Sequence, residues 1–286
     1  MRWFPAMALL AALCCALAPA RAAAADRWFT SSDGVRLHYI EAGQGRTIVL
    51  VPGWTMPAWI WDAQIADFAH RFRVIAFDPR AQGDSAVAPD GYEPFRRGQD
   101  IAELLAASGP GPVLLVGWSL GVLDALAYVH THGDARLAGL VLVDNSVGEE
   151  PPPLPTRPLA VGGGGAAPSR PVWMRRFVAS LFARPPPPAW LDRLTAACLR
   201  TPAPAAAALL RYPVPRSFWK DAVYATARPV LYVVTPRFAG QAENLRRHHP
   251  AAEAVVLHGV GHALFVDDPA RFDALVADFI ARRVWP

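Results

Sequence analysis

One short segment of the sequence has the residue types and spacing for nucleophilic catalysis. Residues 117–121 read Gly-Trp-Ser-Leu-Gly, and they lie between an apolar run at 113–116 and a helical pattern at 122–129. A G-x-S-x-G turn between a strand and a helix projects its serine from the strand end. Gly117 and Gly121 meet a steric need because this turn has no room for side chains. The pattern predicts a nucleophilic Ser119; the alternative is a glycine-bracketed turn with a surface serine.

The elements that would position this serine alternate along the chain. Asp33-Gly34 predicts a hairpin between 28–30 and 35–40. Short apolar runs predict strands, and amphipathic patterns predict helices. The strands are expected at 47–51, 74–77, 113–116, 140–143, 230–234 and 254–257, and the helices at 62–70, 99–107, 122–129 and 269–281. This order predicts an α/β protein with a mostly parallel twisted sheet and helices on both faces.

One region, residues 148–227, interrupts the alternation. It opens with proline and glycine runs and continues with segments that favour short helices. Because it lies between two strands of the sheet, we interpret it as an inserted helical cap over a pocket. A linker between two domains is the alternative, but about 60 residues follow, too few for an independent domain. The predicted organisation is a core at 26–147 and 228–286, with the cap at 148–227 between its parts.

Residues 1–25 have the pattern of a secretory signal peptide. Arg2 is followed by an apolar span at 6–18 and then by small residues, where 20–22 or 23–25 could be cleaved. The prediction is export to the periplasm or beyond the cell. An uncleaved membrane anchor is the alternative, although the apolar span is shorter than the about 20 residues that a bilayer requires. Removal of the signal leaves Cys198 as the single cysteine, which we expect to be a buried, inert thiol.

Charge and composition exclude several classes of function. The formal charge of +4 includes Arg2 and Arg21, so the mature chain would carry about +2, too little to indicate nucleic acid binding. The sequence has no basic stripe, no phosphate-binding loop and no metal-ligand motif. We therefore expect a small-molecule substrate, no nucleic acid partner, no cofactor, no metal and no stable membrane span in the mature chain. The oligomeric state stays open.

With these elements in place, the chain resembles the α/β-hydrolase family of serine hydrolases over residues 27–147 and 228–284. The resemblance implies that family's fold and identifies Ser119 as the nucleophile. The family carries its catalytic histidine in a loop after the last strand, and here Gly261-His262 has that place. His262 is therefore the expected general base. His258, at the end of the strand, is expected to be structural or to line the pocket.

The resemblance also implies an oxyanion hole made of two backbone N–H groups. One belongs to Leu120, the residue after the nucleophile. The other belongs to Trp54, in a Pro52-Gly53-Trp54 segment where the family usually has His-Gly-x. Residues 78–85 resemble the family's D-x-R-G-x-G-x-S loop, with an alanine at one glycine position, and the role implied for that loop is structural.

The third member of the triad is where this chain departs from the family pattern. The family usually places an aspartate in the loop after the penultimate strand, but residues 235–244 contain none. Asp144, at the end of the preceding strand, is the first choice, because some family members carry the acid there. Glu243 is the alternative acid, and a dyad or a water-mediated arrangement is a third possibility. Asp267 and Asp268 are expected to cap the last helix.

These residues predict acyl transfer to water through an acyl-serine. The expected substrate is a small ester or lactone. A perhydrolase or haloperoxidase-like enzyme with the same triad is the alternative reaction, and a weakly catalytic protein that binds small molecules is the alternative class. The G-x-S-x-G turn carries a serine where the dehalogenase and epoxide-hydrolase branches of the family carry an aspartate, which argues against those branches.

Overall fold

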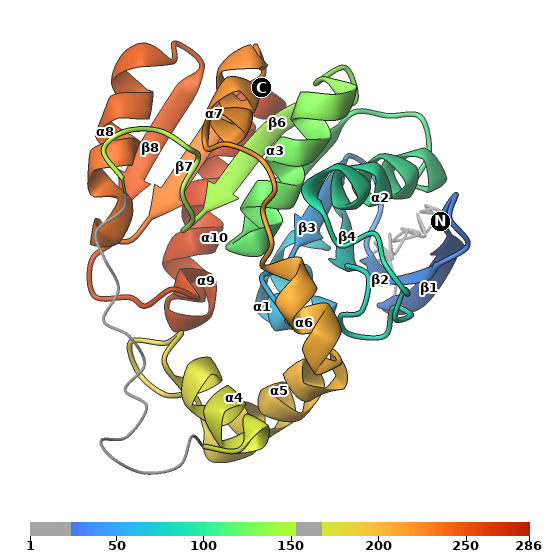
Figure 1. Ribbon diagram of the computed structural model, residues 1–286. Helices are drawn as coiled ribbons and strands as arrows, with labels where there is room; N and C mark the ends of the chain where they lie inside the picture. The colour runs from blue at the N-terminus through green and yellow to red at the C-terminus, as the bar shows by residue number, and fades with distance from the viewer. Residues whose placement is uncertain (1–23, 153–167) are drawn as a thin grey trace, which may run out of the picture.

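The computed structural model describes residues 24–152 and 168–286 and shows a single eight-stranded sheet with helices on both faces (Figure 1). The predicted signal segment lies outside the described residues except for Ala24 and Ala25, and so does the proline- and glycine-rich stretch at 153–167. The strands follow the order β1-β2-β4-β3-β5-β6-β7-β8 across the sheet. β1 and β2 form the expected hairpin and β2 runs antiparallel to β4, whereas all other neighbours are parallel. The predicted α/β fold is confirmed.

The strands begin and end close to the predicted positions. They are β1 (Ala25–Thr30), β2 (Arg36–Ala42), β3 (Thr47–Val51), β4 (Arg73–Asp78), β5 (Val113–Trp118), β6 (Leu137–Val143), β7 (Val230–Val234) and β8 (Ala252–Val256). β5 is buried at all six positions, as a central parallel strand covered on both faces must be. β1 begins at Ala25, one residue before the core boundary expected at residue 26.

The helices either cover the two faces of the sheet or belong to the chain inserted between β6 and β7. They are α1 (Asp62–Phe68), α2 (Pro94–Ala107), α3 (Leu120–His132), α4 (Arg170–Ala179), α5 (Pro188–Arg200), α6 (Ala203–Leu209), α7 (Ser217–Ala225), α8 (Ala239–His248), α9 (Leu264–Asp267) and α10 (Pro269–Phe279), with short turns η1 (Ala58–Trp61) and η2 (Pro236–Phe238) and a π-helical end η3 (Ile280–Val284). α2, α3, α7 and α8 share one apolar cluster, and α1 and α10 share the other. α2 begins five residues earlier than predicted, because Pro94 is well suited to the first turn of a helix.

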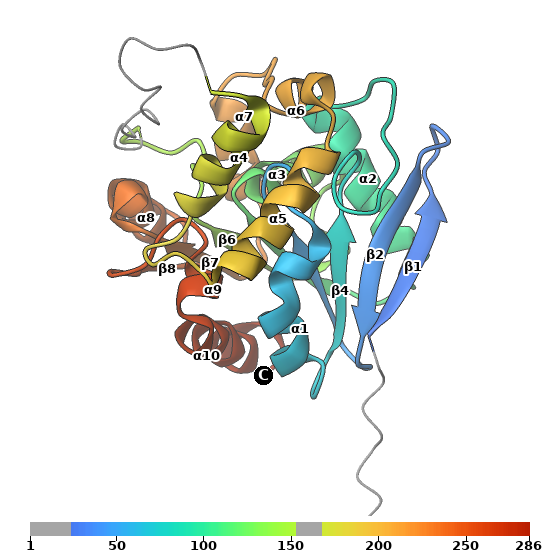
Figure 2. The ribbon, with the colours of Figure 1, turned by 90° about the horizontal axis from the view of Figure 1, so that it is seen from below.

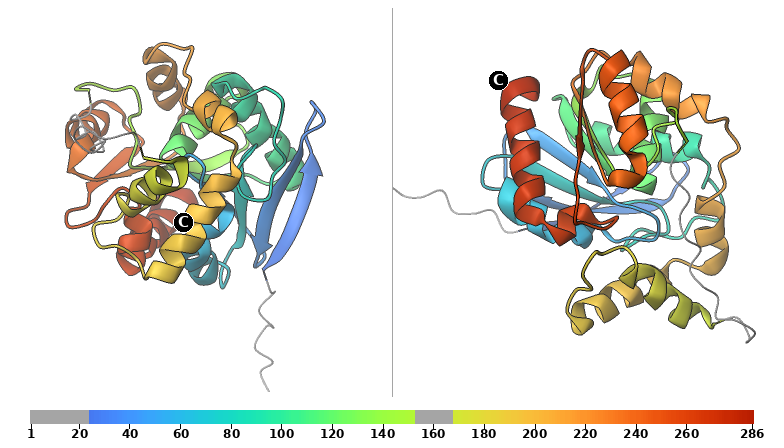
Figure 3. Two further views of the ribbon diagram at one scale, coloured as in Figure 1. Left: turned by 60° about the horizontal axis from the view of Figure 1, so that its bottom comes forward. Right: turned by 90° about the vertical axis from the view of Figure 1, so that its left-hand side faces the viewer.

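The chain between β6 and β7 contains helices and, among its described residues, no strand. α4 and α5 lie beyond the carboxyl ends of the parallel strands and stand off the sheet (Figures 1 and 3). Seen from below, they cross in front of the core (Figure 2). α7 differs, because it packs in the layer beside α3, where the Trp219 indole donates a hydrogen bond to the Leu123 carbonyl at 3.3 Å. The last part of the predicted cap range 148–227 therefore lies in the helical layer of the core.

A buried carboxylate joins the beginning of this inserted chain to α7. Glu149 follows β6 and is 1% exposed. Its carboxylate accepts hydrogen bonds from Lys220 Nζ at 2.9 Å and from the Tyr224 hydroxyl. Burial would raise the pKa of Glu149, but the hydrogen bonds from Tyr224 and Lys220 outweigh it and lower that pKa from 4.5 to about 2. The ionised form of Glu149 therefore stabilises the folded protein.

Replacement of Glu149 with glutamine is expected to lower the melting temperature at pH 7 by on the order of 4 °C, because it removes charge-assisted hydrogen bonds. The pKa of the folded state lies below the unfolded value, so this stabilisation is complete above about pH 4.5 and is lost as the pH falls towards 2. Melting curves from pH 2 to 7 should show the two proteins converging in acid. Glu150→Gln, at the exposed neighbouring position, is the control. A difference between wild type and Glu149→Gln that does not change with pH would contradict this reading.

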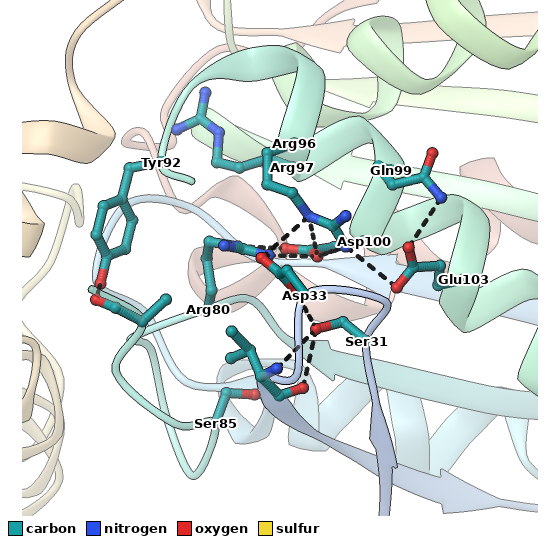
Figure 4. A network of polar contacts seen from close by, with 12 residues as sticks. Ser31, Asp33, Arg80, Ser85, Tyr92, Arg96, Arg97, Gln99, Asp100 and Glu103 are labelled. Atoms are coloured by element: carbon teal, nitrogen blue, oxygen red, sulfur yellow. Dashed lines mark hydrogen bonds and ion pairs between the residues drawn. The ribbon is translucent and has the colours of Figure 1, made fainter. Parts of the chain in front are cut away.

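The loop after β4 is fastened by a buried network around Arg80 (Figure 4). The Arg80 guanidinium donates to both oxygens of Asp100, at 2.6 and 2.7 Å, and to Asp33 at 3.0 Å. Arg96 adds a second guanidinium to Asp100. Arg80 is fully buried, and the network joins the β1–β2 hairpin, the loop after β4 and α2. This position agrees with the structural role expected for the 78–85 loop.

Candidate active site

Ser119 occupies a strained turn between β5 and α3. Its backbone has φ 55° and ψ −117°, a conformation that is rare for residues other than glycine. A Cβ added to Gly117 would lie 2.3 Å from the Gly121 carbonyl oxygen, and one added to Gly121 would lie 2.3 Å from the Val51 carbonyl oxygen. The close packing of β3, β5 and α3 therefore requires both glycines. The Asn145 side chain donates to the Ser119 carbonyl at 2.7 Å and braces the turn.

The structure brings Ser119, His262 and Asp144 into one hydrogen-bonded chain. His262 Nε2 lies 2.8 Å from Ser119 Oγ, and His262 Nδ1 lies 2.7 Å from Asp144 Oδ2. Because a carboxylate only accepts hydrogen bonds, Nδ1 donates to Asp144, which leaves Nε2 to accept the serine proton. The Asp144 side chain is buried, whereas the His262 ring is 27% exposed. The imidazole is therefore accessible to a bound molecule, whereas the Asp144 carboxylate is shielded from water.

Asp144 is held in place by the strand beside it. It follows β6 with φ 47°, and its N–H donates to the Val233 carbonyl in β7. The Oδ1 atom accepts hydrogen bonds from the Thr235 amide at 2.6 Å and the Thr235 hydroxyl at 2.7 Å. Oδ2 is left to receive the histidine. Hydrogen bonds to one carboxylate oxygen thus orient the other towards His262.

The other two candidates from the sequence lie away from this chain of residues. Glu243 is on α8 and pairs with Arg246 and Arg247, each at 3.0 Å. The segment after β7 forms η2 and then α8, so Glu243 extends along a helix surface. His258 is exposed in the loop after β8, and a pocket-lining role for it finds no support in this position.

The histidine loop rests on groups that come from distant parts of the chain. The Trp118 indole donates to the His262 carbonyl at 2.8 Å. The Asp267 carboxylate accepts from the Gly261 amide at 2.6 Å and from the Ala183 amide at 2.9 Å. The expectation that Asp267 caps the last helix is therefore wrong, because its side chain turns back to the loop; only Asp268 caps α10, through the Arg271 amide. Asp267 joins the loop of His262 to the segment between α4 and α5.

The segment after β3 lies directly against the nucleophile. A Cβ added to Gly53 would be 3.0 Å from Ser119 Cβ, so glycine is required where the two loops meet. The Trp54 N–H has no hydrogen-bond partner within the part of the chain that the structure describes. The Leu120 N–H is in the first turn of α3, where an amide has no intrahelical acceptor. One backbone donor thus follows Ser119 in sequence, and the other follows Gly53, which lies against Ser119.

An aromatic cluster from the core and the inserted helices covers the Trp54 side chain. The Trp54 ring packs edge-on against Trp173 and Phe177 of α4, with centroids 6.1 and 5.2 Å apart. Its indole N–H donates to the Ala206 carbonyl in α6 at 2.7 Å. Helices α4 and α6 therefore contact the residue that directly follows Gly53, the glycine that lies against Ser119. A surface cavity of about 530 Å³ near Trp59 and Trp190 lies elsewhere and is lined by none of the three hydrogen-bonded residues.

Two groups outside this site have the residue types for other chemistry. His38, Asp78 and Asp84 offer ligand atoms within 4.8 Å of one another, a grouping that their spacing in the sequence does not indicate. Both nitrogens of His38 already contact carboxylates, Asp78 at 2.7 Å and Asp26 at 3.1 Å, so the imidazole has no atom left for a metal. Cys198 is buried as expected, and burial raises the pKa of its thiol to about 12.

Sequence reasoning missed the residues that brace this site. Asn145, Trp118 and Asp267 support the serine turn and the histidine loop. Asn145 directly follows the predicted acid and Trp118 directly precedes the serine, so adjacency was the available signal. No pattern in the sequence pairs Asp267 with the Gly261 amide, because that contact depends on how the loop closes.

Comparison with known proteins identifies the family. The model of the alpha/beta hydrolase family matches residues 48–275. A non-heme haloperoxidase from Rhodococcus erythropolis is 36% identical over 115 residues, which are 40% of this chain and 42% of that protein. An esterase from a Rhodococcus species has a similar structure, with a TM-score of 0.77 and 27% identity over 90% of this chain and 99% of that one. A bromoperoxidase from Bacillus anthracis follows with a TM-score of 0.75 and 18% identity, covering 90% of this chain and all of that one.

The alignment with the curated haloperoxidase spans about two fifths of that protein's length. The family model, by contrast, extends from β3 into α10 and includes both the serine turn and the histidine loop. The eight-stranded, mostly parallel sheet also agrees with the fold of this family. The resemblance predicted from the sequence is confirmed: the chain belongs to the alpha/beta hydrolase family.

Proposed function

We propose that this protein is a serine hydrolase that cleaves a small carboxylic ester or lactone through an acyl-serine intermediate. The observation that carries the proposal is the continuous chain from Ser119 Oγ through His262 to Asp144, with distances of 2.8 and 2.7 Å. A serine hydroxyl is a weak nucleophile unless a base beside it accepts its proton, and this arrangement supplies the base and its orienting carboxylate.

Each residue has a defined role in the proposed reaction. Ser119 Oγ attacks the carbonyl carbon while His262 Nε2 takes its proton. The N–H groups of Trp54 and Leu120 hold the negative oxygen of the tetrahedral intermediate. His262 then donates the proton to the leaving alcohol, and an acyl-serine remains. A water molecule, deprotonated by His262, attacks the acyl group and releases the acid. Asp144 keeps the histidine in the required tautomer throughout.

The aromatic cluster supports an apolar group in the substrate. Trp54, Trp173 and Phe177 gather beside the loop that borders Ser119. Apolar side chains at this point favour an apolar acyl or alcohol portion, because its burial stabilises the complex by about 25 cal/mol for each Å² removed from water. The similar Rhodococcus structure is named an esterase, which agrees with an ester substrate.

A perhydrolase reaction is the second candidate, and the haloperoxidase relative favours it. In that reaction hydrogen peroxide replaces water in the attack on the acyl-serine and releases a peracid. The same residues would take part, so the two reactions differ in the second nucleophile only. The alternative to a dedicated enzyme is a protein that binds small molecules and has only weak catalytic activity.

We also propose that the chain is exported by its N-terminal segment. The pattern at residues 1–25 supports this, and an N-terminal anchor is the alternative. Among the residues described in the structure, no helix is long and apolar enough to span a bilayer. Expression of the full chain, followed by cell fractionation and mass determination of the N-terminus, separates a cleaved protein from an anchored one.

Hydrolysis of a panel of short-chain aryl esters and lactones tests the proposed reaction. Purified protein should hydrolyse some of them, and a serine-reactive phosphonate should add one label, at Ser119. Peracid formation with hydrogen peroxide, measured on the same protein, distinguishes the perhydrolase. Absence of turnover on the whole panel, together with absence of phosphonate labelling, would refute the enzyme proposal and favour the binding protein.

A further inference from the structure

Gln82, in the loop after β4, contacts the segment after β3, which lies against the nucleophile Ser119. Its side chain is 1% exposed, although glutamine is rarely buried without a specific partner. The loop that carries it is fastened by the Arg80 network on one side and by the Thr201 hydroxyl, which donates to the Ala81 carbonyl at 2.8 Å, on the other. Gln82 is therefore held by a rigid support.

The amide of Gln82 bonds to three backbone groups of residues 53–56. Its Oε1 accepts from the Thr55 N–H at 2.8 Å, and its Nε2 donates to the Gly53 carbonyl at 3.1 Å and to the Met56 carbonyl at 3.3 Å. Both hydrogens of the amide group are used. Thr55 has φ 61°, a left-handed conformation that costs free energy for a threonine. The three bonds hold this segment in a turn that it would not favour by itself.

The Gly53 carbonyl accepts two hydrogen bonds, from Gln82 Nε2 at 3.1 Å and from the Met56 N–H at 3.2 Å, and together they determine the direction of the Trp54 N–H. The Gly53 carbonyl and the Trp54 N–H belong to one planar trans peptide, so they point in opposite directions. While Nε2 holds the carbonyl oxygen, the N–H must point away from Gln82. That N–H has no partner among the described residues, and Gly53 lies against Ser119, so the donor is free to meet a charge that develops at the serine.

We propose that Gln82 is a positioning residue that aims the Trp54 amide at the oxyanion. This inference rests on the proposed acyl-serine reaction. Gln82 does not touch the reacting atoms; it acts through the peptide between Gly53 and Trp54. Loss of its Nε2 donor leaves the Gly53 carbonyl held by the Met56 N–H alone, so that the peptide can rotate further and its N–H stabilises the transition state less.

Gln82→Met tests this role, because methionine has nearly the same volume and lacks both the donor and the acceptor. An oxyanion donor acts in the transition state and hardly in the bound ester, so kcat should fall while KM changes by less than about twofold. We expect a loss in kcat of about 10- to 100-fold, less than the about 10²–10³-fold of a removed oxyanion donor, because the misaimed amide is still present. The affinity for a trifluoromethyl ketone, which forms a tetrahedral adduct, should fall in parallel.

The matched control is Gln64→Met. Gln64 is also fully buried, but its amide group bonds to the Phe265 carbonyl and to Asp273 and does not contact residues 53–56. This variant should lower the melting temperature and leave kcat and the ketone affinity within about twofold of wild type. Gln82→Glu is the second variant: it keeps an oxygen for Thr55 and loses the donor, so it should lose kcat even if Gln82→Met does not fold.

The outcomes separate the two proposals. An active wild type with undiminished kcat in the Gln82 variants would overturn the role of Gln82 and leave the serine reaction intact. Equal losses in Gln64→Met and Gln82→Met, or a rise in KM without a fall in kcat, would also overturn it. A wild type that hydrolyses no ester and takes up no phosphonate would refute the proposed function itself.

Discussion

Replacement of Ser119 with alanine is expected to lower kcat for the best ester of the panel by about 10⁴- to 10⁶-fold. The variant loses the Ser119 hydroxyl oxygen, which lies 2.8 Å from His262 Nε2, so no acyl-enzyme can form. KM should change little, because binding contacts stay intact. Steady-state kinetics measure the loss, and intact-protein mass spectrometry should show the phosphonate label on wild type and none on the variant.

Ser108→Ala is the matched control, because Ser108 ends α2 and bonds to the Leu105 carbonyl, away from the site. Its activity and labelling should equal those of wild type. Ester hydrolysis retained by Ser119→Ala within tenfold of wild type would show that another group is the nucleophile, and the proposed mechanism would then be wrong.

Asp144→Asn is expected to lower kcat by about 10⁴-fold, with the fold intact. Asparagine has the same shape, but its amide group can donate to His262 Nδ1. The histidine then adopts the other tautomer, with a proton on Nε2, and can no longer accept the proton of Ser119. Since Thr235 donates to Oδ1 from its amide and its hydroxyl, the asparagine oxygen should stay at Oδ1 and its NH₂ should face the histidine. Kinetics and a thermal melt together check this result.

Glu243→Gln is the control, because Glu243 was the alternative acid. It is exposed on α8 and bonds to two arginines, so its replacement should change kcat by less than about twofold and the stability very little. A large loss in Glu243→Gln with near-normal activity in Asp144→Asn would reverse our assignment of the acid. Equal, small losses in both would favour a dyad.

The prediction of the triad's acid shows what the local sequence can determine about the site and what it cannot. Asp144 was one of three alternatives, because the loop that usually carries the acid has no aspartate. The structure places Asp144, and not Glu243, beside His262, across a separation of 118 residues. The segment after β7 forms a helix that begins at residue 239, so Glu243 lies on its surface. Whether a carboxylate reaches His262 depends on where its strand or helix begins and ends, and the residue type alone does not show this.

The bracing residues could not be predicted for a similar reason. Gln82 reaches Gly53 only because β4 and β3 are neighbours in the sheet, so the loops that follow them meet at one edge. Asp267 was expected to cap the last helix, and its side chain instead joins the histidine loop to the segment between α4 and α5. Each contact joins residues that are far apart or in irregular loops, where neither the strand period nor the helix period applies.

The sequence by itself determined the α/β fold, the order of strands and helices along the chain, and the serine of the G-x-S-x-G turn. These features depend on hydrophobic periodicity and on glycines within a few residues of the serine. Ser119, Gly117 and Gly121 need only their neighbours to form the turn. The tertiary structure alone decided which carboxylate faces His262, that Gln82 holds the peptide before Trp54, and that the inserted helices pack on that tryptophan. The physical reason is that parallel strands bring their carboxyl-end loops to one edge, and the pairing of those loops follows the order of strands in the sheet.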